Sequence, residues 1–257
     1  MSLFVKPYII KNEKSRIFIV HGICEHSGRY EYLAKKLNEN GFSVITYDLR
    51  GHGKSNGKRG YIKKYQQHIY DLEEIIKEYD NKEVKRYLLG HSLGGLIAHL
   101  YMTSNNQEVD GLITSGAPTE FLTSVKPLRF IGYKWLGFVS VKNNFGTGLL
   151  SKDTEVEQKY NSDPLVLKKF KLRLAGEMFI KGVKNLNKNI IKNNKPILIL
   201  HGYEDKIVPK EFSVKTFELI KHDNKKLVIY DKMYHEIFNE LDKDTVIKDV
   251  ISWVNNN

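Results

Sequence analysis

Short apolar runs rich in β-branched residues alternate along this chain with longer segments of helical spacing, and this alternation limits the possible folds more than any other feature. The apolar runs expected to form strands are 16–20, 42–47, 84–89, 111–115, 196–200 and 227–230. Apolar residues recur at helical spacing over 30–40, 65–79, 93–102, 211–220 and 245–254. Strands joined through helices pair in parallel, so the pattern predicts an α/β fold with a mostly parallel central sheet flanked by helices.

Residues 119–192 interrupt this alternation. They begin with an aromatic, amphipathic stretch at 127–141 and continue as polar segments of helical character without a clear strand. Loops at the carboxyl edge of a parallel sheet are where such proteins bind ligands. We therefore expect an α/β core formed by residues 1–118 and 193–257, carrying an inserted helical cap at 119–192. The apolar side of this cap can equally well serve only to pack on the core.

The composition is that of an ordinary globular protein, with 41% hydrophobic and 28% charged residues in 257 positions. The single cysteine, Cys24, excludes an intramolecular disulfide framework and favours a reducing compartment. The first residues lack a basic segment followed by an apolar stretch, and no run approaches the ~18–20 apolar residues of a membrane-spanning helix. These features predict a soluble, cytoplasmic protein.

Several other functional classes are disfavoured by charge distribution and by motif spacing. The formal net charge is +11, but the basic residues are spread along the chain and are not gathered into one cluster, so we expect no nucleic-acid partner. The segment 53–55 resembles the end of a Walker A loop, yet Asp48 stands where its first glycine belongs, and Asn56 breaks a dinucleotide fingerprint. Asn239 replaces the second histidine of a zinc-protease motif that would begin at His235. We expect no metal and no cofactor.

The strongest chemical signal is a G-x-S-x-G motif at Gly90–Gly94, with Ser92 at its centre, between an expected strand and an expected helix. The glycines permit a sharp turn that exposes the serine hydroxyl beside a helix N-terminus, where developing negative charge is favoured. A second match to the same letters surrounds Ser55, but a loop separates it from the strand and no apolar helix follows. The context therefore selects Ser92 as the candidate nucleophile.

A nucleophilic serine requires a base and an acid that orients the base, which in α/β hydrolases follow in the chain order Ser, Asp or Glu, His. Of the four downstream histidines considered (His99, His201, His222 and His235), His235 comes just after the expected strand 227–230, as this order demands. Asp205 follows the strand 196–200 and is preferred to its neighbour Glu204, because its shorter side chain holds an imidazole more rigidly.

The negative charge that forms on a tetrahedral intermediate requires two backbone donors. We expect the first from the N–H of Leu93, next to the nucleophile. The second should come from the loop after the first expected strand, at Ile23.

Together these segments resemble the monoacylglycerol lipase and lysophospholipase group of α/β hydrolases. The resemblance rests on His21-Gly-Ile-Cys-Glu-His-Ser-Gly-Arg-Tyr30, Tyr47-Asp-Leu-Arg-Gly-His-Gly-Lys-Ser55, Gly90-His-Ser-Leu-Gly-Gly95, Tyr160-Asn-Ser-Asp-Pro-Leu-Val166 and Tyr234-His-Glu236. It implies an α/β-hydrolase fold and a serine esterase that releases one acyl chain from glycerol or a glycerophosphate head.

The same resemblance implies that Glu25 and Arg29 form a polar substrate-binding pocket for the glycerol side; a purely structural ion pair is the alternative. Phe238 departs from the family pattern, because some members carry a polar histidine at that place, and Cys24 stands where small residues are common. These departures leave the ester chemistry in place and the head group open.

We hypothesise that Ser92 attacks an ester of a single-acyl lipid with His235 as general base and Asp205 as the residue that orients it. The alternatives are a short-chain carboxylesterase, thioesterase or peptidase on the same triad, or a non-catalytic hydrolase fold that binds a ligand. Within the cap, the aromatic and basic residues Lys126, Arg129, Lys134, Trp135 and Phe138 suggest transient contact with a lipid surface.

Overall fold

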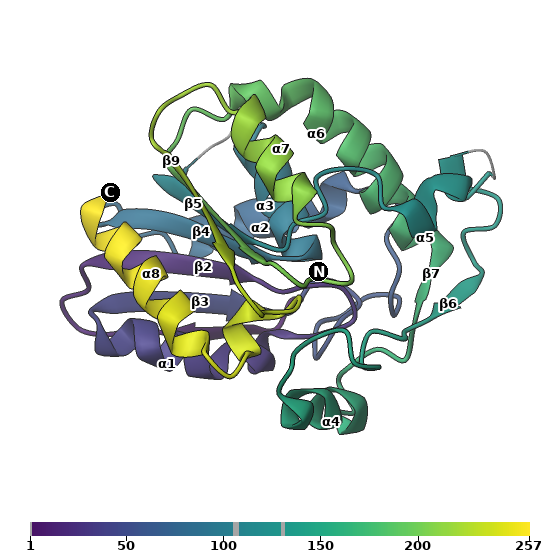
Figure 1. Ribbon diagram of the computed structural model, residues 1–257, viewed down its shortest axis with the longest axis horizontal. Helices are drawn as coiled ribbons and strands as arrows, with labels where there is room; N and C mark the ends of the chain where they lie inside the picture. Colours follow the sequence, from purple (N-terminus) through teal and green to yellow (C-terminus); the bar gives the residue numbers. More distant parts are fainter. Residues whose placement is uncertain (1, 105–107, 130–131) are drawn as a thin grey trace.

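A computed structural model of the chain describes residues 2–104, 108–129 and 132–257 (Figure 1). Within these ranges seven strands form one sheet in the spatial order β1-β3-β2-β4-β5-β8-β9. These strands are β1 Val5–Tyr8, β2 Ser15–Val20, β3 Phe42–Tyr47, β4 Lys85–His91, β5 Gly111–Ser115, β8 Ile197–Gly202 and β9 Lys225–Tyr230. All neighbours pair in parallel except β1 with β3. The predicted mostly parallel sheet is confirmed.

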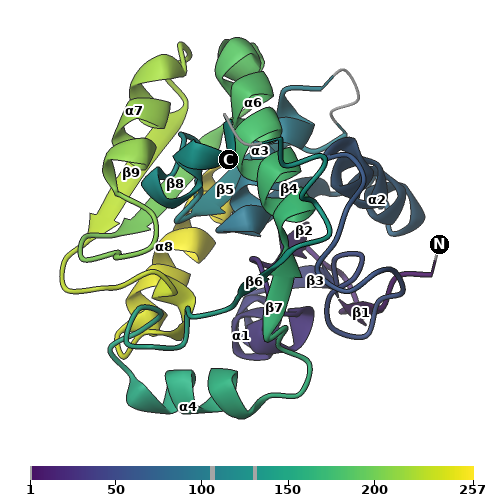
Figure 2. The ribbon, with the colours of Figure 1, turned by 90° about the vertical axis from the view of Figure 1, so that its right-hand side faces the viewer.

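Helices cover both faces of this sheet (Figures 1 and 2). Two of them, α1 and α8, pack on one face, whereas α2, α3 and α7 lie on the other. Their bounds are α1 Glu31–Glu39, α2 Gln66–Glu78, α3 Leu93–Met102, α7 Glu211–Leu219 and α8 Lys243–Asn256. In β2, Ile17 and Ile19 join the core beneath α1 and α8, while Phe18 and Val20 join the core beneath α2 and α3. A strand buried on both faces carries the continuous apolar run that the sequence shows.

Strand β1 was not predicted. It is a four-residue strand at the edge of the sheet and runs antiparallel to β3, with Val5 opposite Tyr47. Pro7 lies within it, and proline is tolerated in a sheet at such an edge because its missing N–H removes no interior hydrogen bond.

Part of the segment between β5 and β8 lies beyond one end of the sheet, where β6 and β7 are seen at the right of Figure 1 and α4 at its lower edge, whereas residues 183–189 pack on α3 over one face of the sheet. Its elements are η2 Thr123–Arg129, β6 Ser140–Lys142, α4 Thr154–Ser162, β7 Lys169–Lys171, α5 Leu172–Ala175, the π-helix η3 Gly176–Gly182, α6 Val183–Asn189 and η4 Ile190–Lys192. The expectation that this segment lacks strands was wrong, because β6 and β7 form a two-stranded antiparallel sheet. Three-residue strands are too short to show an alternating pattern. The division at residues 119 and 192 stays a prediction.

Candidate active site

Ser92 lies at a strained turn between β4 and α3, with φ 52° and ψ −120°. The flanking glycines are required by close approaches: a Cβ on Gly90 would lie 2.4 Å from the carbonyl oxygen of Gly94, and one on Gly94 would lie 2.0 Å from that of Val20. The Ser92 N–H donates to the carbonyl of Ser115 on the next strand, at 2.8 Å. This geometry is that of the sharp strand-to-helix turn expected around a nucleophilic serine.

The alternative serine of the second motif has a different environment. The buried Ser55 hydroxyl donates to the carbonyl of Asp48 and accepts a hydrogen bond from the N–H of Phe4, at 2.8 Å. The first contact closes the loop after β3 on itself and the second holds it against the N-terminal segment, so Ser55 has a structural environment.

Asp205 follows β8 and His235 follows β9, and the two side chains meet although they are 30 positions apart. The Nδ1 atom of His235 lies 2.7 Å from Oδ2 of Asp205. The other carboxylate oxygen accepts from the N–H groups of Ile207 and Val208, at 2.8 and 2.9 Å. Ser92 and His235 line the same cavity. The three residues selected by their order in the chain therefore lie in one region of the structure.

A second histidine contacts the same carboxylate. The Nε2 atom of His201, at the end of β8, lies 3.0 Å from Oδ2 of Asp205 and 2.9 Å from the carbonyl oxygen of Val208. Both neighbours are acceptors, so this nitrogen carries the proton, and Nδ1 of His201 faces the hydroxyl of Ser213 at 2.7 Å. From the sequence, His201 was weighed only as a base. Its position four residues before the acid was the signal for this supporting contact.

These contacts shift the pKa values of Asp205 and His235. Burial alone would raise the pKa of Asp205, but the adjacent His235 and His201 hold that pKa well below its usual range. Burial alone would lower the pKa of His235, but the Asp205 carboxylate raises it above the ordinary value of 6.5. The pair is therefore suited to stabilise an imidazolium during proton transfer.

The two expected oxyanion donors belong to the start of α3 and to the loop after β2. Leu93 is the first residue of α3, so its N–H has no acceptor within the helix. Ile23 belongs to the buried loop after β2 and lines the cavities that contain Ser92. This loop is held by its own side chains, because the N–H of Gly22 donates to Glu25 and Nε2 of His21 accepts from the N–H of Leu49, at 2.9 Å.

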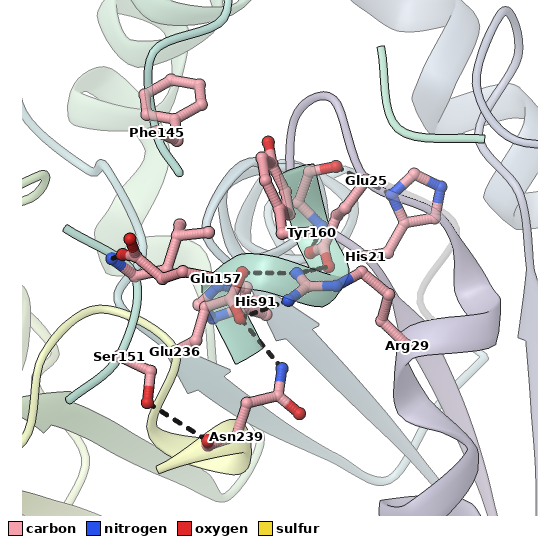
Figure 3. Close-up of polar contacts among 12 residues, drawn as sticks. His21, Glu25, Arg29, His91, Phe145, Ser151, Glu157, Tyr160, Glu236 and Asn239 are labelled. Atoms are coloured by element: carbon pink, nitrogen blue, oxygen red, sulfur yellow. Dashed lines mark hydrogen bonds and ion pairs between the residues drawn. The ribbon is translucent and has the colours of Figure 1, made fainter. Parts of the chain in front are cut away.

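Glu25 and Arg29 belong to a buried ionic network beside this loop (Figure 3). Arg29 donates to Glu25 at 3.0 Å and binds Glu236 through both terminal nitrogens, one of them at 2.7 Å. The side-chain amide of Asn239 donates to Glu236 at 3.0 Å, and the guanidinium lies 4.9 Å from the centre of the Tyr160 ring. Glu236, which the sequence analysis did not identify, follows His235 directly. The ion pair between Glu25 and Arg29 is present, while the substrate-binding role of both residues stays a prediction.

Two cavities meet at Ser92. The smaller one, about 20 Å³, has a mostly apolar surface, but Glu25, Tyr160, His235 and Glu236 are among the residues that line it. The larger one, about 240 Å³, is mostly apolar, and its lining residues are Ile23, Ser92, Pro118, Leu122, Ser124, Val125, Phe145, Leu149, Phe170, Ala175, Phe179, Lys206, Ile207 and Val208. Ile23, Ser92, Phe145 and Ile207 line both. Ser92 thus lies between a large apolar chamber and a small recess lined in part by charged and polar residues.

Across residues 2–104, 108–129 and 132–257, no group of three or more His, Cys, Asp or Glu side chains is placed to hold a metal ion. No helix in those same ranges is both long and apolar enough to cross a membrane.

Comparison with known proteins decides the family. The profile of Hydrolase_4, described as serine aminopeptidase S33, matches residues 11–242. The chain belongs to this serine hydrolase family. Its resemblance to the monoacylglycerol lipase group and its α/β-hydrolase fold are thereby confirmed, as is the prediction of an enzyme of the esterase and lipase type.

Relatives of this S33 family member cover almost its whole length. Monoglyceride lipase of Homo sapiens is 31% identical over 254 residues, covering 94% of this chain and 82% of the human one. Phospholipase YtpA of Bacillus subtilis is 27% identical over 241 residues, covering 90% and 92%. The crystal structure of Paleococcus ferrophilus monoacylglycerol lipase superimposes with a TM-score of 0.89 at 30% identity, covering 99% of this chain and 98% of that one.

Proposed function

We propose that this protein hydrolyses the carboxylic ester of single-acyl lipids, with monoacylglycerol as the substrate type and an acyl-enzyme as the intermediate. The observation that carries the proposal is the position of Ser92 between a large apolar cavity and a small one whose lining includes the carboxylates of Glu25 and Glu236. An ester with one long apolar arm and one small polar arm matches this division. The relatives named monoglyceride lipase support the same substrate class.

In the proposed reaction the Ser92 hydroxyl attacks the ester carbonyl and transfers its proton to Nε2 of His235. Asp205 holds the Nδ1 proton of His235 and stabilises the imidazolium that forms. The N–H groups of Ile23 and Leu93 donate to the oxyanion. His235 then gives its proton to the leaving alcohol, and afterwards activates a water molecule that releases the fatty acid from Ser92.

Glu25 and Glu236 line the small recess, and a carboxylate oxygen can accept a further hydrogen bond, here from a hydroxyl group of a leaving alcohol. This supports a polyol such as glycerol as the leaving group. The guanidinium of Arg29 compensates part of the negative charge of the two carboxylates. Lysophospholipid is the second candidate substrate, because a relative covered over nine-tenths of its length is named a phospholipase. The extent of the apolar cavity argues against the short-chain carboxylesterase and peptidase alternatives.

We further propose that the segment after η2 contacts lipid surfaces while substrate enters. Trp135 and Phe138 are 86% and 67% exposed, and Leu136 and Val139 beside them are also exposed. Exposed aromatic residues beside lysines such as Lys134 are typical of surfaces that insert shallowly between lipid headgroups. Lys126 and Arg129 were expected in the same surface, and their side chains lie outside the described residues.

A cytoplasmic location also remains part of the proposal. Its support is that Cys24 is a free, buried thiol. A chain that holds its fold without a disulfide is compatible with a reducing compartment.

The function is tested by comparing Ser92→Ala with the matched variant Ser55→Ala, which alters the serine of the second motif. A panel of monoacylglycerols, lysophospholipids, short-chain esters and aminoacyl amides is assayed with each variant, together with labelling by a fluorophosphonate probe. Ser92→Ala should lose turnover by several orders of magnitude and lose the label, since only binding and oxyanion effects remain. Ser55→Ala should keep both. Labelling that persists in Ser92→Ala, or a preference for acetyl esters, would contradict the proposal.

A further inference from the structure

The segment 160–167, which begins in the last turn of α4, contacts the loop at 21–26 that carries the proposed oxyanion donor Ile23. The N–H of Leu167 donates to the carbonyl of Cys24 at 2.8 Å. A side-chain contact lies beside it, because Nε2 of His26 is 2.8 Å from Oδ2 of Asp163. Two bonds therefore connect the segment between β5 and β8 to a loop of the core, within three residues of Ile23.

The residues that follow Asp163 in the chain fix its conformation for this contact. It ends α4 with an extended backbone, φ −69° and ψ 120°, because Pro164 disfavours the helical conformation in the residue before it. Its Oδ1 atom accepts from the N–H of Leu165 at 2.7 Å, which closes a tight turn. The second oxygen, Oδ2, is thereby directed at His26.

The hydrogen bonds of His26 define which of its ring nitrogens carries the proton in this contact. Its Nδ1 atom accepts from the N–H of Gly28 at 3.1 Å and so caps η1 Ser27–Tyr30. The proton of a neutral imidazole then resides on Nε2, which donates it to Asp163. One ring thus joins the start of η1 to the end of α4.

The loop needs such support because its backbone is strained. Cys24 has φ 68°, in the left-handed region that non-glycine residues seldom adopt, and its side chain is buried. On the core side the loop is held by Asp48, which accepts from the N–H and hydroxyl of Ser27 at 2.8 and 2.6 Å. On the other side, the bonds to Cys24 and His26 come from the segment 160–167.

We infer that Asp163 and His26 are positioning residues for the oxyanion hole: their contact fixes the loop so that the N–H of Ile23 points at the developing oxyanion. This inference rests on the proposed function. An oxyanion donor acts only when it lies about 2.7–3.1 Å from the charged oxygen, so a small shift of the loop reduces the stabilisation of the transition state. The binding of the acyl chain does not depend on this donor.

The test breaks the contact from each side while keeping the local turns. Asp163→Ser keeps a side-chain acceptor for the N–H of Leu165 but is too short to reach His26. His26→Asn keeps an acceptor that caps η1 but is too short to reach Asp163. Asp153→Ser is the matched control, because Asp153 caps the other end of α4 by accepting from the N–H of Glu155 at 3.0 Å.

Each variant is assayed with a medium-chain p-nitrophenyl ester and with a trifluoromethyl ketone of the same acyl chain, which forms a tetrahedral adduct on the serine. We expect kcat to fall about tenfold in each variant at the contact, less than the ~10²–10³ lost when an oxyanion donor is deleted. KM should stay within about twofold, and the inhibition constant of the ketone should rise by the same factor as kcat falls. The double variant should be no worse than either single one.

The control Asp153→Ser should keep kcat within about twofold of the unaltered protein. The inference is overturned if Asp163→Ser matches this control in kcat, or if its loss appears in KM with ketone binding unchanged. Should one variant at the contact fail to fold in thermal denaturation, the other tests the same bond. An unaltered protein that cleaves no ester and takes no fluorophosphonate label would instead refute the proposed function.

Discussion

Replacing Arg29 by methionine tests whether the ionic network beside the nucleophile holds the fold. Methionine keeps much of the length and the apolar stem of arginine and removes only the guanidinium. The change leaves Glu25 and Glu236 buried without their shared cation. In the folded protein the three side chains are 4%, 5% and 10% exposed for Glu25, Glu236 and Arg29, so water can replace little of the lost interaction.

The magnitude follows from this burial. Removing one partner of a buried ion pair costs about 3–5 kcal/mol in the free energy of unfolding, because the remaining charge is left without compensation. That is a large part of the ~5–15 kcal/mol by which a typical domain is stable. The matched control is Lys35→Met, since Lys35 pairs with Glu31 on the surface with side chains 63% and 44% exposed. Such exposed pairs contribute about 0–1 kcal/mol.

The assay is urea unfolding of both variants at pH 8 and at pH 5. In the unaltered protein, burial would raise the pKa of Glu236, but Arg29 holds it below the ordinary 4.5. The pair therefore stabilises the fold above pH 4.5 and loses this effect as the pH falls through the lowered pKa. In Arg29→Met the folded-state pKa lies above 4.5, so the destabilisation is full at pH 8 and smaller at pH 5, where the carboxyl takes up a proton. A loss below about 1 kcal/mol, or one equal at both pH values, would refute this reasoning.

Three further outcomes are expected. The acid side of the pH profile of kcat/KM should have its midpoint above pH 6.5, because Asp205 raises the pKa of His235 and only the neutral ring accepts a proton. Asp205→Asn should lower this midpoint, and it should lower kcat by about 10⁴-fold. Gly94→Ala should lower the free energy of unfolding in urea by at least ~1–3 kcal/mol, because its Cβ would collide with the carbonyl of Val20, and a neutral effect would contradict the close approach. His68 is buried, its ring nitrogens have no hydrogen-bond partner in the described part of the chain, and its pKa lies well below 6.5. Stability should therefore fall by up to ~1.4 kcal/mol per pH unit for this group as the pH drops below 6.5, and His68→Met should flatten the slope measured by thermal unfolding.

The sequence was informative where a side chain lies within a few residues of the end of a strand. Ser92, Asp205 and His235 each come after an apolar run, and parallel strands bring their carboxyl ends to one edge of the sheet. Chain order and strand position were therefore enough to select residues that the structure places together. The long helices were equally accessible, because their apolar faces recur over several turns.

Other features depend on tertiary contacts that leave no local pattern. Glu236 matters because it meets Arg29, 207 positions away, and the sequence beside it contains only the neighbouring His235. His201 differs from Glu236 in this respect, because it stands only four residues before Asp205. β1, β6 and β7 are held by partner strands and are too short for periodicity to identify.

The order of the strands explains why the segment between β5 and β8 covers the site while leaving the proposed triad on the core. In the sheet, β4 carries Ser92 and lies between β2, whose loop carries Ile23, and β5, from which this segment departs. The chain returns to the sheet at β8, just before Asp205. To contact the loop after β2, as Leu167 does with Cys24, the segment must cross the end of β4. Its side chains therefore line the cavities without joining the proton transfer. Substitutions there should change acyl preference and KM, except at Asp163, where the contact with the oxyanion loop should make kcat respond.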